Sequence, residues 1–117
     1  MVRILVVDDE KPVREAISLL LKQEGYRVVV AECGHTALGA VETFTFDLVI
    51  VDIFMPGMNG IDLLRRLSAD VRNCAARMYV VSAADDEDLR SEARRCGADG
   101  FLKKPLHRKT LLDLLAV

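Results

Sequence analysis

Several polar residues follow directly after short apolar segments of this sequence, and their types suit phosphoryl chemistry. They are Asp8, Asp9, Asp52, Ser82, Lys103 and Lys104. Carboxylates held close together repel one another, and a small hard cation relieves that repulsion; oxygen ligands without His or Cys favour Mg²⁺. A lysine ammonium and a hydroxyl beside the cation can hold the oxygens of a phosphoryl group while a carboxylate attacks phosphorus in line. The set therefore predicts a magnesium-dependent phosphoryl site.

The apolar segments that precede these residues have the length of β-strands. They cover residues 4–7, 28–31, 48–51, 78–81 and 101–102. Continuous apolar segments are typical of strands covered on both faces, as in parallel sheets. In such sheets ligands bind beyond the carboxyl ends of the strands, so the polar residues are expected to meet there. Glu32, which follows residues 28–31, is expected at a sheet edge away from the others.

Amphipathic helical patterns alternate with these strands. The first has an apolar stripe between Val13 and Leu21 and ends near Gly25, the second covers residues 34–43, and the third begins near Gly60. The fourth opens with the acidic residues 85–88 and closes with a basic pair, which suits the helix dipole, and the fifth covers residues 111–115 and runs to the chain end. Alternating strands and helices with short connections predict an α/β fold with a five-stranded, doubly wound parallel sheet.

Composition limits the possible functions. The 117 residues suit one domain, expected over residues 1–117, and a net charge of −2 argues against a nucleic-acid partner. No apolar segment approaches the roughly 20 residues of a membrane span, so no membrane partner is expected. Cys33, Cys74 and Cys96 are odd in number and lack a CxxC spacing, which indicates thiols in a reducing, cytoplasmic compartment.

Four short motifs resemble the receiver domain of bacterial response regulators over essentially the whole chain. They are Asp8-Asp9, Asp52 followed by Met55-Pro56-Gly57-Met58-Asn59-Gly60, Ser82-Ala83, and Lys104-Pro105. The resemblance implies a flavodoxin-like sheet with strand order 2-1-3-4-5. It also implies that Asp52 accepts a phosphoryl group from a phosphohistidine on a sensor histidine kinase or a histidine phosphotransfer protein.

The resemblance further implies how Mg²⁺, with Mn²⁺ as a possible substitute, would be bound. Asp9, Asp52 and the backbone carbonyl of Phe54 would be direct ligands, and Asp8 would help through water. Lys104 would pair with the phosphoryl oxygens, aimed inward by a cis peptide bond to Pro105.

The resemblance implies a conformational switch as well. Ser82 would form a hydrogen bond to the phosphoryl group, and Phe101 would turn inward as Ser82 is drawn toward it. The surface of the fourth helix, the last strand and the last helix would change shape as a result. The output partner or effector domain is left open by the sequence.

Some residues depart from the usual receiver pattern. Phe54 is bulky where the family often has a smaller or polar residue, and we expect it to cover the acyl phosphate and hinder attacking water.

Leu19 falls off the core stripe of the first helix, and together with Pro105 and Leu106 it is expected to form an apolar patch that docks the phosphodonor.

Two other classes of function compete with that of a phosphoacceptor. A receiver-like binding module that never takes phosphate would usually have lost an acid, the hydroxyl or the lysine, and all are present here. An aspartyl phosphatase would carry a second carboxylate where Phe54 stands, and a flavin carrier would not place Asp8, Asp9 and Glu10 in its phosphate loop. We therefore expect a switch that phosphorylates and dephosphorylates itself, without an external turnover substrate.

Overall fold

The predicted alternation of strands and helices is present throughout the computed structural model, which describes residues 2–70, 72–73, 75–84 and 86–115. The elements are β1 (Arg3–Val7), α1 (Lys11–Gln23), β2 (Arg27–Ala31), α2 (Gly34–Thr43), β3 (Leu48–Asp52), α3 (Gly60–Ser68), β4 (Arg77–Ser82), α4 (Glu87–Arg95), β5 (Gly100–Lys103) and α5 (Arg108–Leu115). The expectations for Cys74 and Asp85 lie outside the described residues. Among the described residues, no helix combines the length and apolar character needed to cross a membrane.

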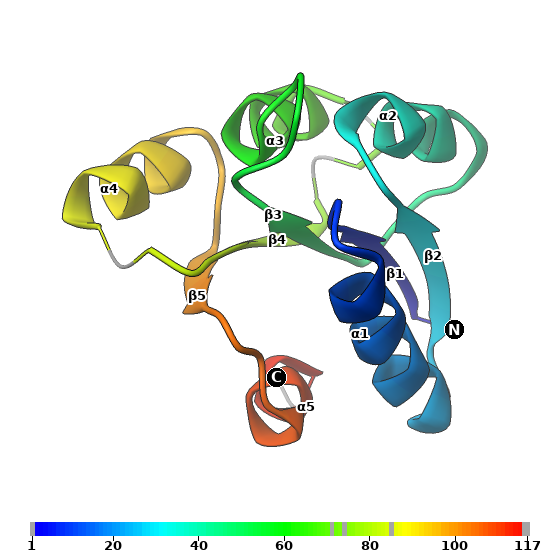
Figure 1. Ribbon diagram of the computed structural model, residues 1–117. Coiled ribbons are helices and arrows are strands. Elements are labelled where there is room, and N and C mark those ends of the chain that lie inside the picture. The colour runs from blue at the N-terminus through cyan, green and yellow to red at the C-terminus, as the bar shows by residue number, and fades with distance from the viewer. Residues whose placement is uncertain (1, 71, 74, 85, 116–117) are drawn as a thin grey trace.

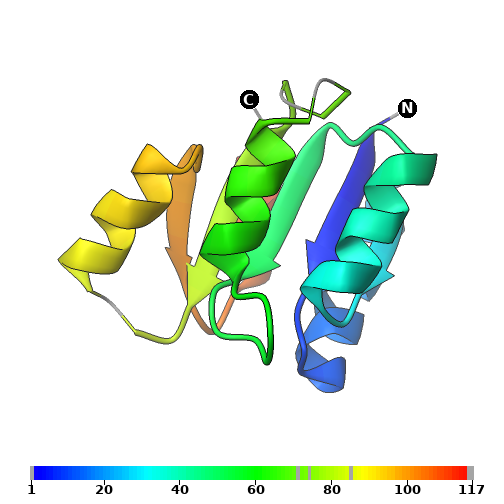
Figure 2. The ribbon, with the colours of Figure 1, turned by 90° about the horizontal axis from the view of Figure 1, so that it is seen from above.

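The five strands form one parallel sheet with the order β2-β1-β3-β4-β5. This confirms both the predicted fold class and the strand order implied by the receiver resemblance. Helices α1 and α5 cover one face of the sheet, and α2, α3 and α4 cover the other (Figure 1, Figure 2). The strand ends are aligned, because Val7 lies opposite Val51 and Ser82 lies opposite Lys103.

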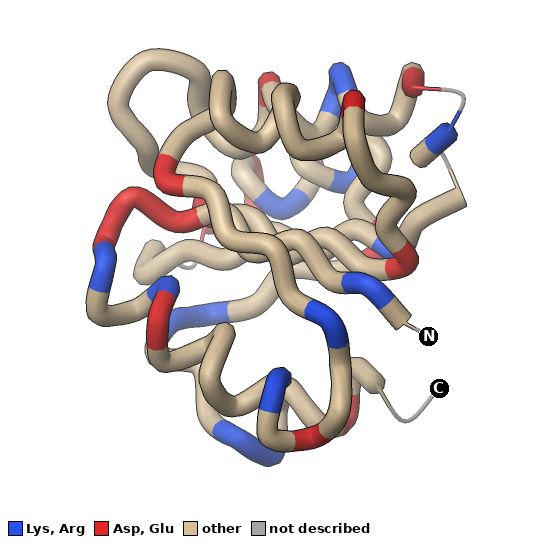
Figure 3. The backbone as a smooth tube through the Cα atoms, turned by 90° about the vertical axis from the view of Figure 1, so that its right-hand side faces the viewer, with Lys and Arg blue, Asp and Glu red and all other residues tan. Residues whose placement is uncertain are grey.

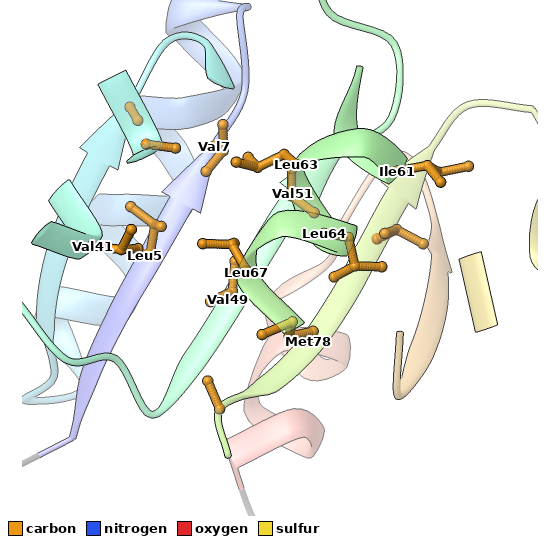
Figure 4. Packing of buried hydrophobic residues seen from close by; sticks show 14 of the residues in the cluster. Leu5, Val7, Val41, Val49, Val51, Ile61, Leu63, Leu64, Leu67 and Met78 are labelled. Carbon is orange, nitrogen blue, oxygen red and sulfur yellow. The ribbon is translucent and has the colours of Figure 1, made fainter. Parts of the chain in front are cut away.

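Two apolar layers hold the helices to the sheet, because successive side chains of a strand point to opposite faces. Ile4, Val6 and Ile50 face α1 and α5, whereas Val49 and Val51 face α2 and α3. Leucines of α3 pack on this second face (Figure 4): Leu63, Leu64 and Leu67. All three are fully buried, and burying each contributes about 1.5–3 kcal/mol to stability.

Local signals fix where the helices begin and end. The side chain of Asn59 accepts a hydrogen bond from the backbone N–H of Asp62 at the start of α3, and that of Asp86 accepts one from Asp88 at the start of α4. Gly25 and Gly97 follow α1 and α4 with φ of 91° and 112°, a conformation that favours glycine. Helix α4 keeps the expected acidic first turn and basic last turn. Asn59 and Asp86 thus end β–α loops, which lie at the edge of the sheet that carries the polar residues, and Gly25 and Gly97 lie in α–β connections.

Candidate functional site

The carboxylates of Asp8 and Asp52 lie side by side at the carboxyl ends of β1 and β3. Their strands are direct neighbours, and alternation places both side chains on the face covered by α1 and α5. Asp8 is 2% exposed and Asp52 is 5% exposed. Two carboxylates this well buried require a cation, since an unpaired buried charge is strongly destabilising.

Lys104 supplies that cation from the end of β5. Its Nζ lies 2.9 Å from Asp8 Oδ2, 3.4 Å from Asp52 Oδ2 and 3.6 Å from Glu10 Oε1. Burial of the ammonium lowers its pKa, but the hydrogen bonds and charges of Asp8 and Asp52 outweigh burial and leave the pKa of Lys104 raised. The peptide bond between Lys104 and Pro105 is cis, as the receiver resemblance implied, whereas Lys103 is exposed. The lysine that precedes the proline is therefore the one at the acids.

The environment of Asp52 makes its carboxylate unusually basic. The pKa of Asp52 is raised from 3.8 to about 6, mainly by burial and next by the negative charge of Asp8. The ammonium of Lys104 opposes this rise, and the charge of Asp9 adds a smaller repulsion. The carboxylate is still ionised at neutral pH. A basic carboxylate is a better nucleophile than an ordinary one, so this environment is in keeping with the role of phosphoryl acceptor that the sequence predicts for Asp52.

The donor set at this edge fits a hard divalent cation. One carboxylate oxygen from each of Asp8, Asp9 and Glu10 can be chosen so that all lie within 4.8 Å of one another. Asp8 is buried, whereas Asp9 and Glu10 are exposed, so the cluster opens to solvent on one side. Oxygen ligands with an open side suit Mg²⁺, which retains water. Phe54, whose backbone carbonyl was expected as a further ligand, lies in the loop after β3 with a side chain 57% exposed.

Ser82 and Phe101 lie on the opposite face of the sheet from Asp52. Ser82 is opposite Lys103 and Phe101 is opposite Val80, so the two residues are two positions apart on neighbouring strands and point to the same face. The Ser82 hydroxyl is fully buried and accepts a hydrogen bond of 3.0 Å from the backbone N–H of Ala84. Phe101 is half-buried, with the guanidinium of Arg90 4.8 Å from its ring centre. This geometry allows a movement of the loop after Ser82 to reach Phe101.

Gly60 positions the backbone of Asp52, a role that the sequence motif did not reveal. Its N–H donates a hydrogen bond of 2.8 Å to the carbonyl of Ile53. A Cβ atom at Gly60 would lie 2.2 Å from the carbonyl oxygen of Asp52 and 2.8 Å from Cα of Ile53. Both neighbours are buried backbone atoms, at the last residue of β3 and the residue directly after it, so they have little freedom to move. Only glycine lets the first turn of α3 approach the acceptor this closely.

Replacing Gly60 with alanine should therefore destabilise the fold by about 1–3 kcal/mol, the usual cost of overpacking. It should also slow any reaction at Asp52, because the carboxylate is displaced. Gly39 is the matched control, because it lies inside α2 with open space around it and gains helix propensity when changed to alanine. Urea unfolding of both variants measures the difference. Equal stability of Gly60→Ala and Gly39→Ala would contradict the close-approach argument.

A groove of about 510 Å³ adjoins the site between α1 and the loop after β5. Its walls include Val13, Ala16, Pro105 and Leu106, and Glu10 and Lys104 stand at its polar end. The predicted apolar patch thus exists, but Leu19 is not part of it. Leu19 is 59% exposed and lines a separate hollow with Val30 of the edge strand. Periodicity correctly placed Leu19 off the core stripe of α1. It could not show that Leu19 lies on the side of α1 next to β2 and not on the side next to the β5–α5 loop.

Comparison with known proteins gives the same family over the whole fold. The family described as response regulator receiver domain matches residues 4–116. Protein PilH of Pseudomonas aeruginosa is 34% identical over 98% of this chain, which spans 95% of PilH. Several longer curated relatives also match, and the chain spans between 16% and 49% of their length.

Two solved structures illustrate the structural similarity. The chemotaxis protein CheY4 of Vibrio cholerae superposes with a TM-score of 0.94 at 30% identity, covering 98% of this chain and 96% of that one. A response regulator from Burkholderia pseudomallei, whose structure contains a phosphorylated aspartic acid and a calcium ion, superposes with a TM-score of 0.92 at 25% identity, covering 100% of this chain and 68% of that one.

Proposed function

This chain belongs to the family of response regulator receiver domains, and we propose that residues 1–117 form one such domain, switched by a phosphoryl group on Asp52. The observation that carries the proposal is the Lys104 ammonium held between the buried carboxylates of Asp8 and Asp52. The phosphorylated aspartic acid in the Burkholderia relative supports the same chemistry. The role is that of a two-component signalling switch rather than of an enzyme with an external substrate.

The transfer uses a phosphohistidine as donor. An oxygen of the Asp52 carboxylate attacks phosphorus while the P–N bond breaks, and the bonding electrons stay on the ring nitrogen, so that histidine leaves as a neutral imidazole with its proton on the other ring nitrogen. The Lys104 ammonium neutralises charge on the phosphoryl oxygens, and the Ser82 hydroxyl donates a hydrogen bond to one of them. Asp9, Asp52 and the backbone carbonyl of Phe54, with help from Asp8, would hold Mg²⁺ or Mn²⁺, and the bound ion would supply positive charge that offsets the phosphoryl charge.

The new charge on Asp52 drives the conformational switch. It draws the Ser82 hydroxyl and its loop toward the phosphoryl group, which frees space on the face that Ser82 shares with Phe101. Phe101 then turns inward from its half-buried position under Arg90, and the surface of α4, β5 and α5 changes. An output partner that reads this surface would distinguish the two states.

The phosphodonor docks beside the acceptor. The apolar groove between α1 and Pro105–Leu106 opens next to Lys104, so a helix carrying a phosphohistidine could pack there and present its phosphoryl group to Asp52. A sensor histidine kinase or a histidine phosphotransfer protein fits this requirement.

We place the reaction in the cytoplasm, in keeping with the free thiols of Cys33 and Cys96. Lys and Arg lie among Asp and Glu in both helical layers (Figure 3), in keeping with a protein rather than a nucleic-acid partner.

Incubation with acetyl phosphate and Mg²⁺, followed by intact-mass measurement, separates this function from a phosphorylation-independent binding module. The wild type should gain one phosphoryl group, and the Asp52→Asn variant should gain none. An unmodified wild type would favour the binding module. An adduct of equal yield on the variant would move the acceptor to another residue.

Phe54 is expected to set the lifetime of the phosphorylated state. Phe54 is 57% exposed two residues after Asp52, where its ring can cover the acyl phosphate and hinder an attacking water. The Phe54→Asn variant should lose its phosphoryl group about 3- to 10-fold faster, a change of roughly 1 kcal/mol in the barrier. Leu19→Asn is the matched control, because Leu19 is a similarly exposed apolar residue away from the site. An unchanged decay rate in Phe54→Asn would refute the shielding role.

A further inference from the structure

Glu10 contacts the catalytic lysine, and the transfer described above gives it no role beyond its place in the acidic cluster with Asp8 and Asp9. Its Oε1 lies 3.6 Å from Nζ of Lys104, and its side chain is 62% exposed. Its backbone N–H donates a hydrogen bond of 2.9 Å to Oδ1 of Asp8, which fixes the start of α1 against the site. Glu10 also lines the groove that adjoins Lys104. It is therefore a negative charge at the solvent side of the ammonium.

The three carboxylates around Lys104 are not equivalent. Asp8 and Asp52 approach the ammonium from the protein interior, with side chains only 3% and 5% exposed, whereas Glu10 approaches it from solvent. An incoming phosphoryl group must come from solvent too, because the interior side is occupied. It therefore meets the negative charge of Glu10 and competes with it for the same ammonium. Coulomb repulsion grows in proportion to the net charge of the donor.

We propose that Glu10 determines phosphodonor specificity by charge, an inference that rests on the proposed function of Asp52. It disfavours donors with two negative charges, such as carboxylic-phosphoric anhydrides. It is more permissive to phosphoryl groups bonded to a protonated nitrogen, whose positive charge offsets one of the phosphoryl charges. Phosphohistidine with a protonated ring belongs to this second class. Glu10 thus restrains phosphorylation by small metabolic acyl phosphates more than phosphorylation by a histidine donor.

The test compares two small donors on the full chain with saturating Mg²⁺. Acetyl phosphate represents the doubly charged class, and phosphoramidate, which carries one net negative charge at neutral pH, represents the nitrogen-linked class. The Glu10→Gln variant should react about 3- to 10-fold faster with acetyl phosphate, and its gain with phosphoramidate should be about the square root of that factor. The preference for phosphoramidate should therefore fall. Intact-mass measurement over time gives each rate.

Three comparisons separate a charge effect from a structural one. The gain should shrink in about 1 M salt, where screening acts over roughly 3 Å. Glu10→Asp keeps the charge and should keep most of the preference. Glu15→Gln removes an exposed carboxylate of the same helix that pairs with Lys11, and it should change neither rate. Equal thermal midpoints for these variants would show that folding is unaffected.

Equal acceleration with both donors, or none with either, would overturn the charge filter, as would the same gain in Glu15→Gln. A wild type that accepts phosphate from neither donor would contradict the proposed function as well. Phosphorylation of the wild type with an unchanged donor preference in Glu10→Gln would overturn the inference about Glu10 alone.

Discussion

The Lys104→Met variant is expected to be less stable than the wild type by about 2–4 kcal/mol at neutral pH in the presence of a chelator. The substitution keeps an apolar stem of similar length but removes the ammonium that lies 2.9 Å from Asp8 and 3.4 Å from Asp52. Two buried carboxylates are then left without a counter-charge. Removing one partner of a buried ion pair costs more than the pair contributes, because the remaining charge stays desolvated.

The loss should depend on pH and on metal in a defined direction. The pKa of Lys104 is raised in the folded protein, so the ammonium itself stays charged throughout the acidic and neutral range and its own titration causes no pH dependence there. In the variant, Asp52 loses the ammonium that opposes the rise of its pKa, so acidification protonates Asp52 more readily and reduces the difference in stability between the variant and the wild type. At neutral pH, Mg²⁺ should reduce the same difference in stability, because the cation supplies another counter-charge to the carboxylates.

Urea unfolding at pH 7 and pH 5 measures both effects, and Lys103→Met is the control because Lys103 is the exposed neighbour. Stability of Lys104→Met equal to that of Lys103→Met at pH 7 would contradict the central role of the ammonium.

Replacing the acceptor Asp52 is expected to stabilise the protein, in contrast to replacing Lys104. Asp52→Asn should raise the free energy of unfolding of the metal-free protein by about 1–3 kcal/mol at pH 7.5. The pKa of Asp52 is raised from 3.8 to about 6 by burial and by Asp8, so the folded state holds this proton more tightly than the unfolded state does. The wild type therefore loses stability as pH rises from about 4 to about 6 and stays lower above that range. Asparagine removes the repulsive charge and with it this loss.

Unfolding curves from pH 4 to pH 8 with chelator test the effect. The gain of Asp52→Asn should be small near pH 4 and should reach its full size above pH 6. Asp9→Ala should show a smaller gain, because Asp9 is exposed and contributes the weakest of the repulsions on Asp52. A variant that is no more stable than the wild type at pH 7.5, or whose gain is independent of pH, would contradict the pKa assignment. Adding Mg²⁺ should reduce the gain, because the cation neutralises the same carboxylate in the wild type.

The sequence predicts much of this site because the geometry of a parallel sheet leaves little choice. Each strand of such a sheet ends at the same edge, so a polar residue directly after an apolar segment is placed there by topology alone. Topology places Asp8, Asp52 and the pair Lys103 and Lys104 in this way, whereas the choice of Lys104 came from the receiver resemblance, in which the lysine precedes a proline. The order of the strands could not be predicted in this way, because periodicity carries no information on which strand pairs with which. The correct strand order came from the receiver resemblance.

Features that depend on side-chain packing could not be predicted. In the sequence, Glu10 is one of three consecutive acids. Its contact with Lys104 depends on its position as the N-cap residue of α1, directly after the end of β1. The close approach of Gly60 to the carbonyl of Asp52 depends on where α3 lies on the sheet. The neighbours of Leu19 depend on the edge position of β2, beside which it lies.

Chemical mapping of the acceptor tests the central claim most directly. The chain is phosphorylated with phosphoramidate and Mg²⁺, reduced with borohydride, which converts a phosphoaspartate to homoserine, and digested for peptide mass analysis. We predict homoserine at position 52, with Asp8 and Asp9 unchanged. Homoserine at position 8 or 9, or a phosphoryl group that resists borohydride and maps to Ser82, would contradict the assignment of Asp52 as the acceptor.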